Sequence, residues 1–116
     1  MALVLCTGVD TVLIRTRQLV LQKAGHKVVT AIDVSAVIAA CQQNAFDVAV
    51  IGQAGSGHIK RQIMALIREY CPATKVLELY RFSMGRVLEE ADAWLEVPVD
   101  VPQELAEHVS ALAAQA

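Results

Sequence analysis

Continuous apolar runs alternate along the chain with stretches in which apolar residues recur every three or four positions. The runs predict strands, and the three- and four-residue spacing predicts helices with one buried face. The predicted strands are residues 2–6, 26–31, 46–51, 75–79 and 93–96. The predicted helices follow Asp10 and either Asp33 or Ser35, cover residues 58–70 and 83–90, and begin at Pro102. This alternation predicts a parallel sheet covered by helices on both sides.

The same spacing predicts which side of each element is buried. Residues 46–51 have the character of a central strand, whereas residues 26–31 have the polar flanks of an edge strand. The predicted inner faces comprise Val12, Thr16, Leu19, Val20 and Lys23 in the first helix, Ile59, Ile63, Leu66, Ile67 and Tyr70 in the third, and Val101, Leu105, Val109 and Leu112 in the last. Arg15 and Arg17 are expected on an outer, solvated face of the first helix, with docking to an acidic partner as the alternative.

Length and composition narrow the class of protein. The 116 residues suit one domain spanning residues 1–116, and 55% hydrophobic but only 4% aromatic content predicts an aliphatic core. No run of 18 uncharged apolar residues occurs, so no membrane span is expected. The formal charge of −2, with both signs mixed along the chain, argues against a general nucleic-acid binder. Three widely spaced cysteines indicate free thiols and a cytoplasmic location.

Two segments carry a resemblance to a known family. Residues 25–29 read Gly-His-Lys-Val-Val and are followed at residues 45–51 by Ala-Phe-Asp-Val-Ala-Val-Ile. Residues 91–98 read Ala-Asp-Ala-Trp-Leu-Glu-Val-Pro. With the strand–helix alternation between them, they make the whole chain resemble a response-regulator receiver domain of the CheY-like superfamily. The resemblance implies a flavodoxin-like, doubly wound, five-stranded parallel sheet of order 2-1-3-4-5 with helices on both faces.

The residues that would carry receiver chemistry are missing. Cys6 and Thr7 stand where the family places two magnesium-binding acids, and a thiol and a hydroxyl do not replace carboxylates for a hard cation. Gly52 stands at the phosphoacceptor position, Val97 at that of the conserved lysine, and Tyr80 at that of the hydroxyl residue. The resemblance therefore implies a degenerate pseudo-receiver with no aspartyl phosphorylation, metal, cofactor or enzymatic activity.

The segment between Tyr80 and Val97 is shorter than in the family by about one helical turn, which implies a shortened fourth helix. Trp94 stands where the family has its switch aromatic. It is expected either to cover the sheet edge or to anchor an interface with a protein partner, with homodimerisation through this region as one form.

Residues 52–57 form a glycine-rich loop before a predicted helix, and Lys60 and Arg61 follow it. Gly52, Gly55, Ser56 and Gly57 could present backbone N–H groups to an anion, although the spacing is not that of a P-loop. The alternative is a merely flexible loop.

Other candidates for chemistry are weaker. Cys6 is expected to be a buried structural thiol, and Asp10 a helix cap. The three histidines, His26, His58 and His108, lack metal-ligand spacing. The primary hypothesis is a phosphorylation-independent signalling and protein-interaction module related to two-component (phosphorelay) response regulators. The alternative is a small anionic-ligand or nucleotide sensor that uses the loop after the third strand.

Overall fold

The computed structural model describes residues 2–52 and 57–115. In chain order the elements are β1 (Leu3–Thr7), α1 (Thr11–Lys23), β2 (Lys27–Ala31), α2 (Val34–Gln43), β3 (Val48–Ile51), α3 (Gly57–Tyr70), β4 (Lys75–Tyr80), β5 (Ala93–Glu96) and α4 (Gln103–Ala113). The strands form one parallel sheet in the order β2-β1-β3-β4-β5. The predicted flavodoxin-like architecture and strand order are confirmed.

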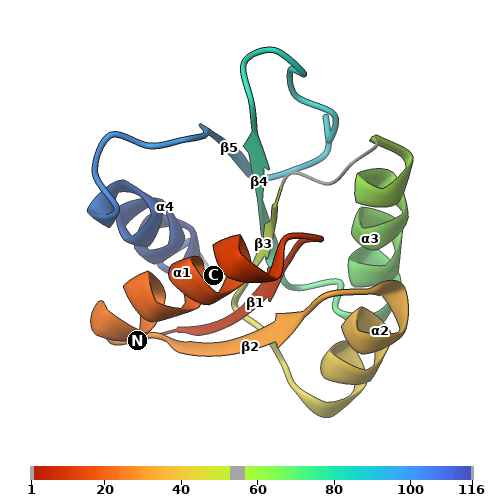
Figure 1. Cartoon of the computed structure of the whole chain (residues 1–116). Helices are drawn as coiled ribbons and strands as arrows, with labels where there is room; N and C mark the ends of the chain where they lie inside the picture. Colours follow the sequence, from red (N-terminus) through yellow and green to blue (C-terminus); the bar gives the residue numbers. More distant parts are fainter. Residues whose placement is uncertain (1, 53–56, 116) are drawn as a thin grey trace.

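The helices cover the two faces of the sheet in pairs. Figure 1 shows α1 and α4 on one face and α2 and α3 on the other, with β2 and β5 at the two edges. Successive residues of a strand point to opposite faces. Leu5 and Ala49 therefore pack into the apolar cluster under α2 and α3, whereas Val4 and Val48 join the cluster under α1 and α4. Every residue of β3 is buried, which confirms its central position.

Short polar side chains and glycine set the helix ends. Oδ1 of Asp10 accepts from the amides of Val12 and Leu13 at 3.0 and 3.2 Å, as a helix cap does. Gly25, with φ of 95°, follows α1 in the left-handed conformation expected there. Asp33, rather than Ser35, caps α2. None of the helices in the described part of the chain is long and apolar enough to cross a membrane.

Some of the predicted helix faces were wrong. In α1 the buried residues are Ile14 and Leu21, whereas Val12 is 72% exposed and Leu19 is 50% exposed. Apolar residues occur on several sides of this helix, so spacing alone does not decide which side meets the sheet. Tyr70, in the last turn of α3, and Val101, just before α4, are also exposed, at 40% and 53%.

The predicted shortened fourth helix between β4 and β5 was also wrong, because that segment consists of turns and irregular chain. Glu78 of β4 provides the physical reason. Its carboxylate accepts hydrogen bonds from the amides of Val87 and Leu88 at 2.9–3.1 Å, so these amides do not pair within a helix. Gly85, with φ of 73°, turns the chain in the left-handed region just before them.

Candidate functional site

The five residues at the family's chemical positions, Cys6, Thr7, Gly52, Tyr80 and Val97, make up the predicted degenerate pocket. Its first part lies where β1 and β3 end side by side. Cys6 and Thr7 of β1 pair with Val50 and Ile51 of β3. The Thr7 hydroxyl donates to the Val50 carbonyl at 3.2 Å, and the Gly52 amide donates to the Thr7 carbonyl at 2.9 Å. The fold therefore brings Cys6, Thr7 and Gly52 together, all of them buried.

The backbone at Gly52 leaves no room for a side chain. A Cβ atom added there would lie 2.9 Å from the Thr7 carbonyl oxygen and 2.7 Å from Nη1 of Arg17. The arginine tip can swing aside, but a backbone carbonyl inside a sheet cannot move without disturbing its strand. Gly52 is thus more than a position that lacks an aspartate, because the surrounding atoms occupy the space that any side chain would need.

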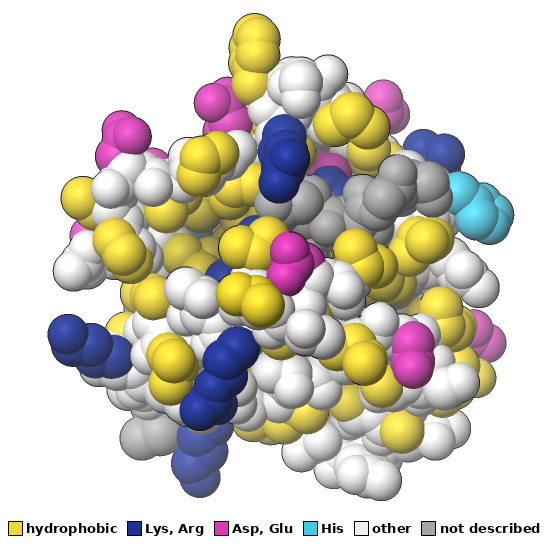
Figure 2. Space-filling view, viewed as in Figure 1, with side chains coloured by type: hydrophobic (Ala, Val, Ile, Leu, Met, Phe, Trp, Pro, Cys, Tyr) yellow, Lys and Arg dark blue, Asp and Glu magenta, His cyan; other side chains and the backbone are white. Residues whose placement is uncertain are grey.

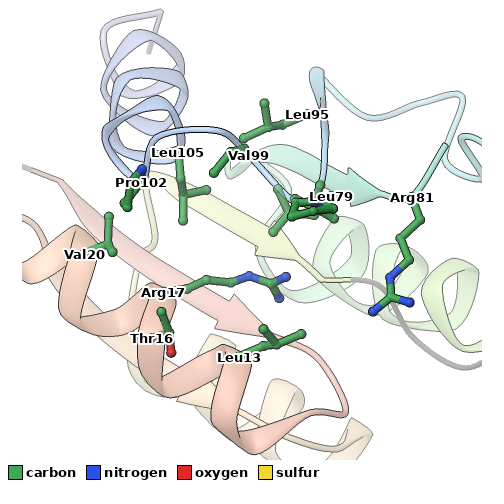
Figure 3. A pocket seen from close by; sticks show the side chains of 12 residues that line it. Leu13, Thr16, Arg17, Val20, Leu79, Arg81, Leu95, Val99, Pro102 and Leu105 are labelled. Atoms are coloured by element: carbon green, nitrogen blue, oxygen red, sulfur yellow. The ribbon is translucent and has the colours of Figure 1, made fainter.

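Arg17 is a functional candidate that sequence reasoning misplaced. It was expected on the solvated face of α1, yet its guanidinium reaches Gly52, at the end of β3. Figure 3 shows the side chain extending from α1 along the cavity rather than away from the protein. Burial lowers the pKa of Arg17, an effect that Cys6 and Asp10 oppose and Arg81 reinforces. A positively charged side chain consequently lies beside Gly52, where β1 and β3 end.

Cys6 lies within the electrostatic reach of this arginine but remains a neutral thiol. Burial raises the pKa of Cys6 to about 11, and the charge of Arg17 offsets this rise only in part. The thiolate is the form that attacks electrophiles and binds metals. Cys6 at neutral pH is accordingly a small apolar group of the core, as the sequence predicted.

Tyr80 and Val97 form the second part of the predicted pocket, where β4 and β5 end. The Val97 amide donates to the Tyr80 carbonyl at 2.8 Å, and Val97 is buried immediately before the cis bond to Pro98. Val97, which the resemblance aligns with the lysine of the family, is thus a buried aliphatic residue. The Tyr80 ring lies beneath the guanidinium of Arg86, whose Cζ is 5.6 Å from the ring centroid.

Trp94, the predicted interface candidate, is half-buried and has partners within the chain. Its indole N–H donates to the Leu88 carbonyl at 2.9 Å, and Cζ of Arg86 lies 4.8 Å from its ring centroid. The same ring packs against the apolar cluster under α2 and α3. In this arrangement Trp94 holds the β4–β5 connection to the sheet.

A buried ion pair beneath this connection was missed from the sequence. Nζ of Lys60 lies 2.8 Å from Oε2 of Glu78 and donates to the Leu79 carbonyl at 2.8 Å. Both side chains are buried. The spacing could have indicated the burial of Lys60, because this residue precedes Ile63 and Ile67 by three and seven positions and so shares their face of α3.

Only part of the predicted ligand loop can be placed. Gly55 and Ser56 lie outside the described residues, whereas Gly57 begins α3. A Cβ atom at Gly57 would lie 3.2 Å from Val87 and 3.3 Å from Nη1 of Arg61, so the start of α3 packs closely against the β4–β5 connection.

The histidines do not converge on a site. His26 is buried, its Nδ1 accepts from the Ala2 amide at 3.1 Å, and its Nε2 lies 3.0 Å from the Ser110 hydroxyl. Nδ1 of His108 lies 2.9 Å from the Glu104 carbonyl of the same helix. Among residues 2–52 and 57–115, no three His, Cys, Asp or Glu side chains gather as a metal site would require.

Between α1 and α4 lies a cavity of about 320 Å³, lined by Arg17, Arg81 and Val97 among others. Figure 2 shows hydrophobic side chains gathered over this region. Because Arg17 touches Gly52 and also lines this cavity, the two parts of the predicted pocket meet at its guanidinium.

The sequence matches no protein-family model and no curated protein. Solved structures nevertheless share the fold closely. The chemotaxis response regulator CheY4 of Vibrio cholerae superposes with a TM-score of 0.81 at 23% identity, over 97% of this chain and 98% of that one.

Two receiver domains give the same result. The Francisella response regulator 1452 receiver domain has a TM-score of 0.79 at 18% identity, over 99% of this chain and 98% of its own. A response regulator receiver domain protein from Clostridium thermocellum has a TM-score of 0.79 at 19% identity, over 99% and 96%. The chain therefore has the fold of CheY-like receiver domains along nearly its whole length.

Proposed function

We propose that this protein is a phosphorylation-independent interaction module of a signalling system related to two-component response regulators. Its fold is that of receiver domains. The observation that carries the proposal is the packing at Gly52, where the Thr7 carbonyl and the Arg17 guanidinium occupy the space of an acceptor side chain.

Phosphoryl transfer to an aspartate needs a nucleophilic oxygen and charge neutralisation by a metal ion and a cation. Here the acceptor position offers no nucleophile, Cys6 is a neutral thiol, and Val97 places an aliphatic group where the lysine would stand. Arg17 supplies a fixed positive charge, which would oppose the entry of Mg²⁺ next to it.

The test is incubation with acetyl phosphate or beryllofluoride in the presence of Mg²⁺, followed by intact-mass measurement and heteronuclear NMR. A phosphorylatable receiver treated in parallel is the positive control. We expect neither a phosphoryl mass increment nor shifts of the Thr7 and Gly52 amides. Stoichiometric modification, or beryllofluoride-dependent shifts at these amides, would refute the proposal.

The proposed partner is a protein, in the first instance a second copy of this chain. Phe82 and Met84 on the β4–β5 connection are 83% and 70% exposed. Hydrophobic side chains stand out at the tip of this connection in Figure 2. Because Trp94 is engaged within the chain, these two side chains are better candidates for interface anchors than the tryptophan.

A sensor of small anions or nucleotides at the loop after β3 is the second candidate. The observation that favours it is Arg61, whose Nη1 would lie 3.3 Å from a Cβ atom at Gly57, next to the start of α3. Helix starts attract anions. Thermal-shift screening with nucleotides and phosphorylated metabolites tests this candidate, and no shift at millimolar ligand would count against it.

A further inference from the structure

The cavity between α1 and α4 combines apolar walls with two positively charged side chains. It lies against the carboxyl ends of β4 and β5 and has a volume of about 320 Å³. That volume is at the lower end of the range for small-molecule sites, roughly 300–1,000 Å³. Aliphatic side chains make up most of its wall, namely Leu13, Val20, Leu79, Leu95, Val97, Val99 and Leu105.

The charged groups of the cavity are Arg17 and Arg81. Figure 3 shows Arg17 entering from α1 and Arg81 descending from the end of β4, so that both guanidinium groups face the same space. The proximity of these like charges also contributes to lowering the pKa of Arg17. Among the described residues that line the cavity there is no carboxylate.

Asp10 acts on Arg17 electrostatically but does not line the cavity. Its Oδ1 already accepts hydrogen bonds from the amides of Val12 and Leu13 at the start of α1. An anion placed between the two guanidinium groups would offset the repulsion between them and gain a charge-assisted contact with the exposed Arg81.

We propose that this cavity binds a small amphipathic monocarboxylate of the medium-chain fatty-acid type. The carboxylate lies at Arg17 and Arg81, where guanidinium groups suit its planar pair of oxygens. The hydrocarbon tail follows the aliphatic wall between α1 and α4, where it is removed from water. A second cavity of about 410 Å³ shares Val20 and Pro102 with the first, so a longer tail has apolar surface to continue along.

The wall disfavours a nucleotide. Apart from the two arginines, Thr16 is the one polar side chain among the described residues that line the cavity, and its hydroxyl donates to the Val12 carbonyl at 3.0 Å. A ribose and a base would bring several polar groups into this space, and polar groups buried without partners are costly. A single charged head on an apolar body fits this lining better.

This inference goes beyond the proposed function and does not rest on it. Both involve Arg17 and Val97, but the absence of phosphorylation rests on the packing at Gly52, whereas ligand binding rests on the aliphatic wall of the cavity and on Arg81. Either result can fail while the other holds, because the first experiment follows a mass increment and the amides of Thr7 and Gly52, whereas the second follows the amides of α1 and α4 and the heat of binding.

The experiment is titration of the folded chain with octanoate, followed by heteronuclear NMR and isothermal calorimetry. Three further probes test the parts of the ligand separately. 1-Octanol has the tail without the charge, acetate has the carboxylate without the tail, and inorganic phosphate is an anion with neither the carboxylate nor the tail. We expect octanoate to shift the amides of α1 and α4 and to bind at least about tenfold more tightly than each of the three, a factor equal to 1.4 kcal/mol.

The variants are Arg17→Gln and Arg81→Gln, with Arg15→Gln as the matched control. Arg15 lies on the same helix but is exposed and hydrogen-bonded to Gln18. Because Arg81 is exposed, its replacement should leave folding intact even if Arg17→Gln lowers stability. We expect Arg81→Gln to weaken octanoate binding about tenfold and Arg15→Gln to leave it unchanged.

The proposal is overturned by any of three results. One is no binding of octanoate at millimolar concentration. A second is binding of 1-octanol, acetate or phosphate as tightly as octanoate. The third is an equal loss of affinity in Arg15→Gln, or shifts confined to α2 and α3, either of which would place the carboxylate outside this cavity.

Discussion

Gly52 is held at the end of β3 by contacts that only glycine allows. The Thr7 carbonyl that would clash with a Cβ atom is the same one that accepts the Gly52 amide at 2.9 Å. The hydrogen bond and the missing side chain are thus two aspects of one close backbone approach. Placing an aspartate at this position would require both the Thr7 carbonyl and the Arg17 guanidinium to shift.

This packing predicts that Gly52→Ala lowers the free energy of unfolding by about 1–3 kcal/mol, the usual cost of overpacking. Urea denaturation measures the change. Gly8→Ala is the matched control, because its Cβ would meet Ile14 at an ordinary 3.5 Å. At a compatible position alanine is neutral or stabilises by about 0.4–1 kcal/mol. Equal effects of both substitutions would contradict the packing argument.

At the scale of elements, Glu78 determines how the chain returns from β4 to β5. Its carboxylate binds Lys60 of α3 on one side and the amides of Val87 and Leu88 on the other. Three segments therefore depend on one buried charge. Because this charge is satisfied by the irregular connection, the connection is ordered without forming a helix.

Lys60→Met should destabilise the protein by about 3–5 kcal/mol, because it leaves the buried Glu78 charge without its cation. Chemical denaturation measures this loss. Lys27→Met, at an exposed lysine of the edge strand, is the control and should change stability by less than about 1 kcal/mol.

Hydrogen exchange tests whether the Glu78 carboxylate holds the β4–β5 connection, separately from its pairing with Lys60. In Glu78→Leu the amides of Val87 and Leu88 should exchange much faster, whereas distant amides of β1 keep their order of protection. Unchanged protection of Val87 and Leu88 in this variant would show that the carboxylate does not hold the connection.

His26 ties the start of β1 to α4, and this contact predicts a pH dependence of stability. Burial lowers the pKa of His26 below its ordinary value of 6.5. The unfolded chain therefore takes up the proton first, so the contribution of the neutral ring is complete above pH 6.5 and is lost as the pH falls through the lowered pKa.

Thermal unfolding between pH 7.5 and 5 should show this decline in the native sequence and a shallower one in His26→Gln. His58→Gln is the control, because that side chain is exposed at the start of α3. An unaltered pH slope in His26→Gln would mean that other groups govern the acid sensitivity.

At the scale of the whole molecule, the exposed side chains of the β4–β5 connection stand out from a sheet that is otherwise well covered. Phe82 and Met84 contribute little to the packing of the folded chain, because most of their surface is in water. An aromatic and a methionine side chain are typical of protein interfaces. Exposed apolar side chains lower the solubility of a protein, and a partner that covers them would remove this effect.

We expect the protein to self-associate in sedimentation experiments at rising concentration, and Phe82→Ser to shift the equilibrium toward monomer by about tenfold or more. Stability should change by less than about 0.5 kcal/mol, since the side chain is exposed. Leu19→Ser, at an exposed leucine of α1, is the control. A monomer at all concentrations, or equal effects of both substitutions, would show that Phe82 does not mediate self-association.

Much of the fold could be predicted because its signals are local. Apolar runs and helical spacing gave the strands and most of the helices, and Asp10 and Gly25 marked helix ends through bonds to their own neighbours. Cys6, Thr7, Gly52 and Val97 are read from the sequence in the same way, and their correspondence to receiver positions stays a prediction. The prediction failed between Tyr80 and Val97, where a buried carboxylate from another element overrides the local preference for helix.

The sequence by itself determined the alternation of elements and the parallel sheet that follows from it, whereas the lack of receiver chemistry stays a prediction. Only the tertiary structure decided that Arg17 turns inward to meet Gly52, that Lys60 and Glu78 pair, and that α1 and α4 leave a cavity between them. The physical reason is the separation along the chain over which each kind of signal acts. Periodicity acts within one element, whereas the position of a long charged side chain depends on which element packs beside it.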